Sequence, residues 1–274
     1  MLRARLAYGA RVTWDLQSSY DAYPQIEEAF EADLDASLSP RGPGFLYDLV
    51  AAMNLPRGAA AVDVGCGEGA HSIQLERRFG FDVVGIDPVE RHIEVSAAAD
   101  GAAGVRFVLG SAEHIPLGDE SVDLVWCRDV LVHVADLDAA YREFHRVLKP
   151  GGRVLVYQMC LGPALVAGDE GFLATMGVIP SSADREAIGG VIARSGLRLD
   201  ERIDIGTEWG EYAQETNGGP ARKMLHAARL LRDWDRWVER YGEAACQIKL
   251  GDSLWHVYAM IGKLTRTAYL LTKA

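Results

Sequence analysis

The stretch 60–73, which reads AAVDVGCGEGAHSI, limits most strongly what this chain can fold into. A short apolar run that contains Asp63 leads into three alternate glycines, Gly65, Gly67 and Gly69, and then into a helix-like pattern. Glycine permits a positive φ and lets the backbone approach a ligand, because it has no Cβ. The helix that follows turns its positively polarised N-terminus toward whatever lies over the turn. The stretch predicts a strand, a tight turn and a helix, and the turn either cradles a ligand or only redirects the chain.

Asp87 ends the next predicted strand, eighteen residues after Gly69. A carboxylate at this position can accept hydrogen bonds from both hydroxyl groups of a ribose. Aspartate is also a preferred helix N-cap, so Asp87 could instead cap a helix that begins near Pro88. The glycine spacing is G-x-G-x-G and therefore departs from the dinucleotide fingerprint G-x-G-x-x-G. Together with the glycine turn, we favour the ribose interpretation.

Strand and helix patterns alternate from residue 60 onward. Continuous apolar runs between amphipathic helices predict an α/β, Rossmann-like fold with a seven-stranded, mostly parallel sheet covered by helices on both faces. The expected strands are 60–64, 82–86, 105–109, 122–127, 153–159, 197–205 and 266–271, and the expected helices of the core are 69–79, 88–99, 136–148 and 182–195. Ligands in such sheets bind beyond the carboxyl ends of the strands, where the glycine turn lies.

Helical segments flank the core. Residues 24–38 and 45–53 have helical periodicity, and we expect both helices to cover the glycine turn. Residues 208–263 interrupt the alternation with a helical stretch over 220–241 and an apolar one around 254–261, as a lid would. The predicted organisation is an N-terminal helical cover (1–56), a core (57–207), a lid insertion (208–263) and a final core strand (264–274).

Composition excludes several classes of partner. The formal net charge is −11, from 28 basic and 39 acidic residues, which argues against binding to nucleic acid or an anionic membrane. The four cysteines lie far apart without metal-type spacing, which predicts free, mostly buried thiols, no metal site and a cytoplasmic location. We see neither a signal peptide nor a membrane-spanning stretch.

Five motifs in order carry a family resemblance. After the glycine turn come Gly85-Ile86-Asp87, Gly110-Ser111-Ala112-Glu113-His114-Ile115-Pro116-Leu117, Ser121-Val122-Asp123-Leu124-Val125 and Arg146-Val147-Leu148-Lys149-Pro150-Gly151-Gly152. The series resembles the class I S-adenosylmethionine-dependent methyltransferases, most of all the branch that acts on quinones, sugars and secondary metabolites. The resemblance covers roughly residues 43–160.

The resemblance implies S-adenosyl-L-methionine as the cofactor and a set of residues that bind it. That set is Asp63, Gly65, Cys66, Gly67, Asp87, Pro88, Ser111, Ala112, Glu113, Cys127 and Tyr20. Asp63 and the Cys127 carbonyl would hold the methionine amine, Asp87 the ribose, and Ser111 with Ala112 the adenine. The family usually has aspartate where this chain has Ser111, but serine can still accept a hydrogen bond.

The catalytic base is the second departure from the family. Relatives that methylate sugar hydroxyls often carry paired histidines and an aspartate, where this chain has Val132-His133 and Gln158. His133 is the candidate base by resemblance, although a histidine here can also be structural. Other candidates are His226, His256 and a tyrosine of the N-terminal cover. The same fold can also catalyse a cyclisation without transferring methyl, which is the alternative function.

The lid composition indicates the substrate. Its aromatic residues are Trp209, Tyr212, Trp234, Trp237, Tyr241, Trp255 and Tyr258. They either form a helix core or homodimer contact, or they form an apolar wall for a bulky substrate. The arginines between them suit a solvated face or, as the minority interpretation, an anionic substrate group. We predict methylation of a bulky, partly apolar secondary metabolite, on oxygen first and on carbon or nitrogen next.

Overall fold

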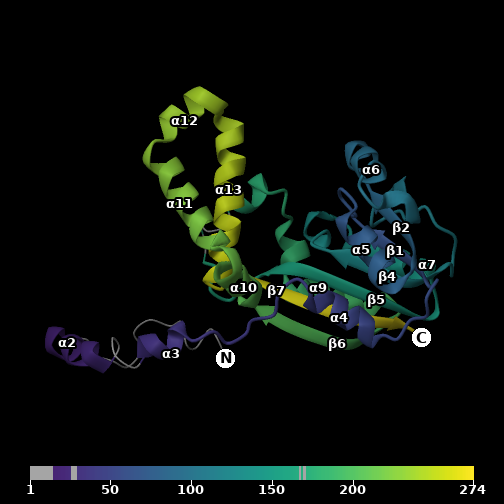
Figure 1. Cartoon of the computed structure of the whole chain (residues 1–274), viewed down its shortest axis with the longest axis horizontal. Coiled ribbons are helices and arrows are strands. Elements are labelled where there is room, and N and C mark those ends of the chain that lie inside the picture. The colour runs from purple at the N-terminus through teal and green to yellow at the C-terminus, as the bar shows by residue number, and fades with distance from the viewer. Residues whose placement is uncertain (1–14, 26–29, 167, 169–170) are drawn as a thin grey trace.

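A central sheet organises the chain in the computed structural model, which describes residues 15–25, 30–166, 168 and 171–274. Its strand order is β3-β2-β1-β4-β5-β7-β6 (Figure 1). The strands are β1 (Ala60–Val64), β2 (Asp82–Asp87), β3 (Val105–Leu109), β4 (Val122–Arg128), β5 (Leu148–Leu161), β6 (Leu197–Gly206) and β7 (Leu264–Lys273). The first five are parallel, and β7 runs antiparallel to β5 and β6. The predicted Rossmann-like, mostly parallel sheet is confirmed.

Strand β5 begins earlier than the sequence predicts. Pro150-Gly151-Gly152 reads as a break, yet Leu148 already pairs with Val122, and the ladder resumes between Arg153 and Leu124 after a register shift. The bulge therefore lies inside one strand, because pairing on both of its sides holds the chain extended.

Helices cover both faces of the sheet and build two cores. They are α4 (Phe45–Ala52), α5 (Ala70–Phe79), α6 (Glu90–Ala97), α7 (Leu137–Val147) and α9 (Arg185–Arg194). Side chains of α7 and α9 pack with Val62 and Val64 in one core, whereas side chains of α4 and α5 pack with Ala61 in the other. Alternate residues of β1 thus point to opposite faces of the sheet. All four cysteines are buried and free, as predicted.

Only one N-terminal helix reaches the core. Helices α2 (Leu16–Gln25) and α3 (Glu31–Asp35) extend away from the sheet (Figure 1). The expected helix over 24–38 is therefore wrong in its bounds, and residues 26–29 lie outside the described part. Helix α4 packs against β1 and α5, and Tyr47 contacts His71. The chain after α3 attaches to the lid, where Ser37 donates to Glu215 at 2.7 Å and Arg41 pairs with Glu208.

The predicted lid is a helical hairpin on a short base. It comprises α10 (Glu208–Asn217), α11 (Gly219–Arg232), α12 (Trp234–Tyr241) and α13 (Glu243–Met260). Helices α11 and α13 lie side by side, and α12 closes the far end (Figure 1). The helix expected over 220–241 breaks at Asp233, whose φ of −125° and ψ of 42° are not helical. Among the described residues, no helix has the length and apolar character that crossing a membrane requires.

Shorter helices complete the chain. They are α8 (Gly171–Thr175) and the 3₁₀ helices η2 (Ala102–Gly104), η3 (Leu131–His133) and η4 (Pro180–Ala183). The predicted helix 182–195 is thus divided at Asp184, whose side chain accepts from the Ala187 amide and caps α9.

Candidate functional site

The glycine turn lies between β1 and α5, and all three of its alternate glycines have positive φ: 71° at Gly65, 52° at Gly67 and 85° at Gly69. A Cβ on Gly65 would lie 2.2 Å from a methyl carbon of Val130, so packing requires glycine there. A Cβ on Gly67 would meet no atom of the protein within 4 Å. The backbone at Gly67 therefore borders open space, as a ligand cradle requires.

Asp63 lies beneath this turn. Its carboxylate is 2% exposed and accepts a hydrogen bond of 2.6 Å from the Ser72 hydroxyl in α5. Burial raises the pKa of Asp63 to about 6, against the stabilising effects of Ser72 and the Arg128 charge. The residue joins β1 to the first turns of α5 and so fixes the shape of the glycine turn.

Asp87 connects the end of β2 to the glycine turn. One carboxylate oxygen accepts from the Gly67 amide at 2.9 Å, and the other accepts from the Val89 amide at 2.9 Å and contacts His92 Nδ1 at 2.9 Å. The N-cap of α6 is Val89, which has no side-chain cap, so Asp87 braces the loop before the helix and does not cap it.

Two exposed apolar side chains flank the ends of the neighbouring strands. Val89 is 45% exposed and Leu109 is 56% exposed, and Leu109 pairs with Asp87 across β2 and β3. The predicted adenine-contacting residues follow directly. Ala112 is buried, Ser111 and Glu113 are half-buried, and Ser111 forms a backbone bridge with His114. Together these residues form an apolar edge beside Asp87.

A polar chain extends the turn toward the lid. Cys127 is fully buried at the end of β4 beside Val64. The next residue, Arg128, lies with Nη1 2.5 Å from His71 Nε2, and His71 Nδ1 lies 2.6 Å from the Tyr47 hydroxyl. Burial and the Arg128 charge lower the pKa of His71 to about 4. His71 is therefore neutral at pH 7, and its Nε2 accepts from Arg128.

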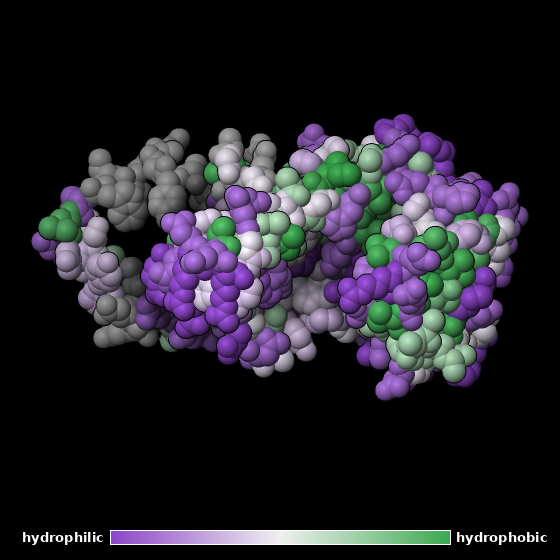
Figure 2. Space-filling view, turned by 90° about the horizontal axis from the view of Figure 1, so that it is seen from above, coloured by the Kyte–Doolittle hydropathy of each residue, from purple (hydrophilic) through white to green (hydrophobic). Residues whose placement is uncertain are grey.

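A cavity of about 290 Å³ opens beyond Arg128, between the sheet and the base of the lid. Figure 2 shows the surface hollowed between the lid and the part of the molecule that holds the sheet. The cavity is lined by Arg128, Asp129, Tyr157, Trp209, Gly210, Ala213, Pro220, Trp255, His256, Ala259 and Arg266. Because Arg128 also contacts His71, only two residues after Gly69, the cavity and the glycine turn adjoin.

Three titratable residues of the cavity have defined environments. Asp129 has a φ of 56°, and burial raises its pKa. Burial also raises the pKa of Tyr157, whose hydroxyl stays protonated. His256 Nδ1 lies 2.9 Å from the Asp252 carbonyl oxygen, which can only accept. Nδ1 therefore carries the proton, and Nε2 is the free acceptor.

The structure keeps several predicted residues away from this cavity. His133 is exposed and its Nδ1 lies 2.9 Å from the Gly177 carbonyl. Val132 is fully buried, and Gln158 is buried with its amide donating to Ser182.

Tyr20 is 64% exposed on α2, which extends away from the glycine turn (Figure 1). Pro88 is exposed beside Asp87.

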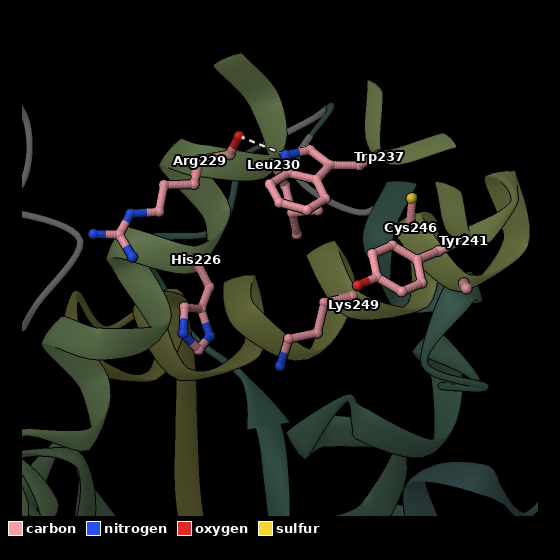
Figure 3. A pocket seen from close by; sticks show the side chains of 8 residues that line it. His226, Arg229, Leu230, Trp237, Tyr241, Cys246 and Lys249 are labelled. Carbon is pink, nitrogen blue, oxygen red and sulfur yellow. Dashed lines mark hydrogen bonds between the residues drawn. The ribbon is translucent and has the colours of Figure 1, made fainter. Parts of the chain in front are cut away.

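A second pocket, of about 470 Å³, lies within the lid hairpin. Trp237 and Tyr241 of α12 form one side, and Cys246 of α13 is also part of it (Figure 3). His226 lines it as well, while the guanidinium of Arg229 points away from it (Figure 3). The aromatic residues of the lid thus divide, since Trp209 and Trp255 line the first cavity instead. The lid hairpin pocket shares no residue with the glycine turn.

Sequence reasoning missed Tyr47, His71, Arg128 and Arg266. Two of them had a local signal, because His71 follows the glycine turn by two residues and Arg128 ends a strand at the ligand-binding edge. Tyr47 and Arg266 come from α4 and β7, far away along the chain, and only their packing reveals them.

Comparison with known proteins is consistent with this geometry. Residues 62–156 match a family model described as a methyltransferase domain. The chain is similar to Methyltransferase GfsG of Streptomyces halstedii, with 30% identity over 61% of this chain and 63% of that protein. It is 37% identical to Phosphoethanolamine N-methyltransferase 1 of Arabidopsis thaliana over 42% of this chain and 24% of that one. The chain thus covers less than two thirds of either relative.

A solved structure extends the similarity beyond residues 62–156. The 4+2 cyclase SpnF superposes with a TM-score of 0.64 and 23% identity, over 84% of this chain and 80% of that chain. At this level of identity the similarity shows the fold alone.

Proposed function

We propose, because the chain contains a class I S-adenosylmethionine-dependent methyltransferase domain at residues 62–156, that it transfers a methyl group to a small molecule. The acceptor would occupy the cavity between the sheet and the base of the lid. The observation that carries the proposal is the contact of Arg128 with His71, which makes that cavity adjoin the glycine turn.

The residues around the turn fit the cofactor. The cofactor would lie against the backbone in the open space at Gly67. Asp87 offers a carboxylate, 6% exposed, at the edge of that space. Val89 and Leu109 supply exposed apolar surface, which would otherwise face water, for an adenine ring. Asp63, Cys66 and Cys127 would shape the methionine end, while Ser111, Ala112 and Glu113 would border the adenine.

S-adenosylmethionine supplies a methyl group on a positively charged sulfur. The protein must then mainly hold the acceptor atom in line with that group, at about 3–3.5 Å, and exclude water. Trp209, Trp255 and Pro220 provide a wall on the lid side of the cavity that can position a bulky acceptor. A small-molecule acceptor of the secondary-metabolite type, methylated on oxygen or else on carbon or nitrogen, fits these apolar walls.

His256 is the base that the cavity favours. In the neutral ring Nε2 is the acceptor because Nδ1 faces the Asp252 carbonyl, and His256 lines the cavity. An alcohol or phenol acceptor needs a base of this kind, whereas a carbon or amine acceptor needs less help. His133, which the family resemblance suggested, remains a candidate only if the acceptor extends beyond the described cavity.

Paired glycine variants test the cofactor site. Gly67 and Gly58 both have positive φ, 52° and 76°, and both border open space. Replacement of either by alanine therefore costs a similar backbone strain, roughly 1–2 kcal/mol. Only Gly67→Ala should also weaken S-adenosylhomocysteine in calorimetry, since only Gly67 lies in the turn. Equal affinity of the two variants, or no binding by the native protein, would exclude the proposed site.

A cyclisation that retains the cofactor's methyl group is the second candidate function. It is favoured by the positions of Val132 and Gln158, which are buried away from the cavity and provide no histidine–aspartate pair there. Incubation of candidate metabolites with methyl-labelled cofactor separates the two functions. Label in the product supports methyl transfer, and an unlabelled rearranged product supports cyclisation.

A further inference from the structure

Three buried polar atoms around the cavity between the sheet and the base of the lid lack a well-formed hydrogen bond, although the Arg266 guanidinium interacts with the Tyr157 hydroxyl. They are Arg128 Nε, the Tyr157 hydroxyl and Arg266 Nη1. They come from β4, β5 and β7, and all three residues line the same cavity. A buried donor that stays unpaired costs about 1–3 kcal/mol. Three such donors around one cavity indicate a ligand that brings acceptor oxygens to them.

The charge of the cavity is positive. Arg128 and Arg266 are permanent cations, and the Tyr157 hydroxyl stays protonated because burial raises its pKa. Asp129 is the one acid among the lining residues, and its carboxylate lies 3.9 Å from Arg128 Nη2, too far for a hydrogen bond. A single added negative charge would balance the site.

The walls around these donors are flat and apolar. The Trp209 ring meets Tyr157 edge to face, with centroids 4.3 Å apart, and the Arg128 guanidinium lies 5.2 Å from the Trp209 centroid. Trp255, Ala213, Pro220 and Ala259 line the same cavity. A volume of about 290 Å³ suits a compound of one or two rings.

We propose that the acceptor is a flat, ring-containing carboxylate whose carboxylate group binds Arg266, Arg128 and the Tyr157 hydroxyl while its rings lie against Trp209 and Trp255. This inference rests on the proposed function only in calling the bound molecule a methyl acceptor. The binding of a carboxylate depends on the cavity residues alone and does not require the cofactor. The charge balance favours a carboxylate, with one negative charge, over a phosphate with nearly two.

A matched pair of probes tests the inference on the full-length protein. Calorimetry would compare 2-naphthoate with 2-naphthamide, which have nearly the same shape but differ in charge. We expect the carboxylate to bind at least about tenfold more tightly than the amide, as hydrogen bonds to charged groups predict. Equal affinities, or binding of neither probe, would overturn the proposal. Tighter binding of 2-naphthyl phosphate than of 2-naphthoate would overturn the choice of a carboxylate.

Variants test whether the preference for the carboxylate over the amide arises in this cavity. Arg266→Gln should remove most of the preference for the carboxylate, and Arg266→Lys should restore part of it. Tyr157→Phe keeps the ring packing and should weaken 2-naphthoate severalfold, which covers the case in which Arg266→Gln fails to fold. Arg229→Gln, in the lid hairpin pocket, is the control and should change nothing. A preference that survives both Arg266→Gln and Tyr157→Phe would place the anion elsewhere.

S-adenosylhomocysteine is titrated separately, so that the two proposals can fail independently. Binding of S-adenosylhomocysteine without a carboxylate preference would overturn this inference and leave the proposed function standing. A carboxylate preference without S-adenosylhomocysteine binding would overturn the proposed function and leave the anion site standing.

Discussion

His256 has one tautomer because of a backbone carbonyl on the preceding turn of its own helix. The carbonyl oxygen of Asp252 can accept only, so the neutral ring carries its proton on Nδ1 and leaves Nε2 as the acceptor. The same logic applies to His133 and Gly177, but that histidine does not line the cavity. At the residue scale, position relative to the cavity and not residue type separates the two candidates.

Replacement of His256 tests this distinction. His256→Gln should lower kcat by about 10²–10⁴ for an alcohol or phenol acceptor, because proton removal contributes that much. The affinity for S-adenosylhomocysteine should stay within about twofold, since the residue lies on the acceptor side. The rates are measured with an acceptor identified by the methyl-labelled assay. His226→Gln, in the lid hairpin pocket, is the matched control, and an unchanged kcat in His256→Gln would remove His256 as the base.

The lid consists of two parts that line different cavities. Its base, α10 together with the C-terminal half of α13, contributes Trp209, Trp255 and His256 to the acceptor cavity. Its far end contains α12, which buries none of its residues, and the lid hairpin pocket. The ion pair of Lys223 with Asp252, at 2.5 Å, crosses from α11 to α13 between these parts.

Shortening of the hairpin separates the two parts. Replacement of residues 226–249 by a short Gly-Ser linker would remove the lid hairpin pocket but keep the Lys223–Asp252 pair and every lining residue of the acceptor cavity. We expect cooperative melting and affinities for S-adenosylhomocysteine and 2-naphthoate that stay within about threefold. A loss of binding by a variant that still melts cooperatively would mean that the far end of the lid shapes the cavity.

At the scale of the whole molecule, two buried groups under one turn act on stability in opposite directions as pH changes. The folded-state pKa of Asp63, about 6, lies above its ordinary value of 3.8, and that of His71, about 4, lies below its ordinary 6.5. The contribution of Asp63 to folding stability therefore falls as pH rises through 4–6. The contribution of His71 falls as pH drops from 6.5 toward 4, because the histidine of the unfolded chain takes up a proton first. The two effects partly cancel in the native protein.

Asp63→Asn should reveal the pH dependence of folding stability that Asp63 contributes. Asparagine can still accept the Ser72 hydrogen bond but cannot ionise, so the variant should gain stability relative to the native protein as pH rises from 4.5 to 7. The relative gain should be roughly 2 kcal/mol over this pH range for a shift of this size. Urea unfolding at several pH values measures it. Asp82→Asn, at the exposed start of β2, serves as the control, and a pH-independent difference for Asp63→Asn would contradict the raised pKa.

The sequence by itself determined the sheet, the glycine turn and Asp87. These depend on local causes, namely strand periodicity, positive φ at alternate glycines and a carboxylate directly after a strand. Local patterns also predicted helices between the last two strands of the chain, where α10 to α13 lie. They could not set the helix break at Asp233, where α12 turns to pack against α13. Nor could they set the continuation of β5 through Pro150-Gly151-Gly152, because pairing with β4 decided it.

Only the tertiary structure decided the cavity between the sheet and the base of the lid. Arg128, Tyr157, Trp209 and Arg266 come from four elements that are far apart along the chain, and no spacing within the sequence relates them. Their convergence depends on the antiparallel insertion of β7 between β5 and β6, which brings Arg266 opposite Met159 and beside the end of β5. A turn built from consecutive residues can be predicted from the sequence, whereas a cavity shared by distant strands and helices exists only once they pack.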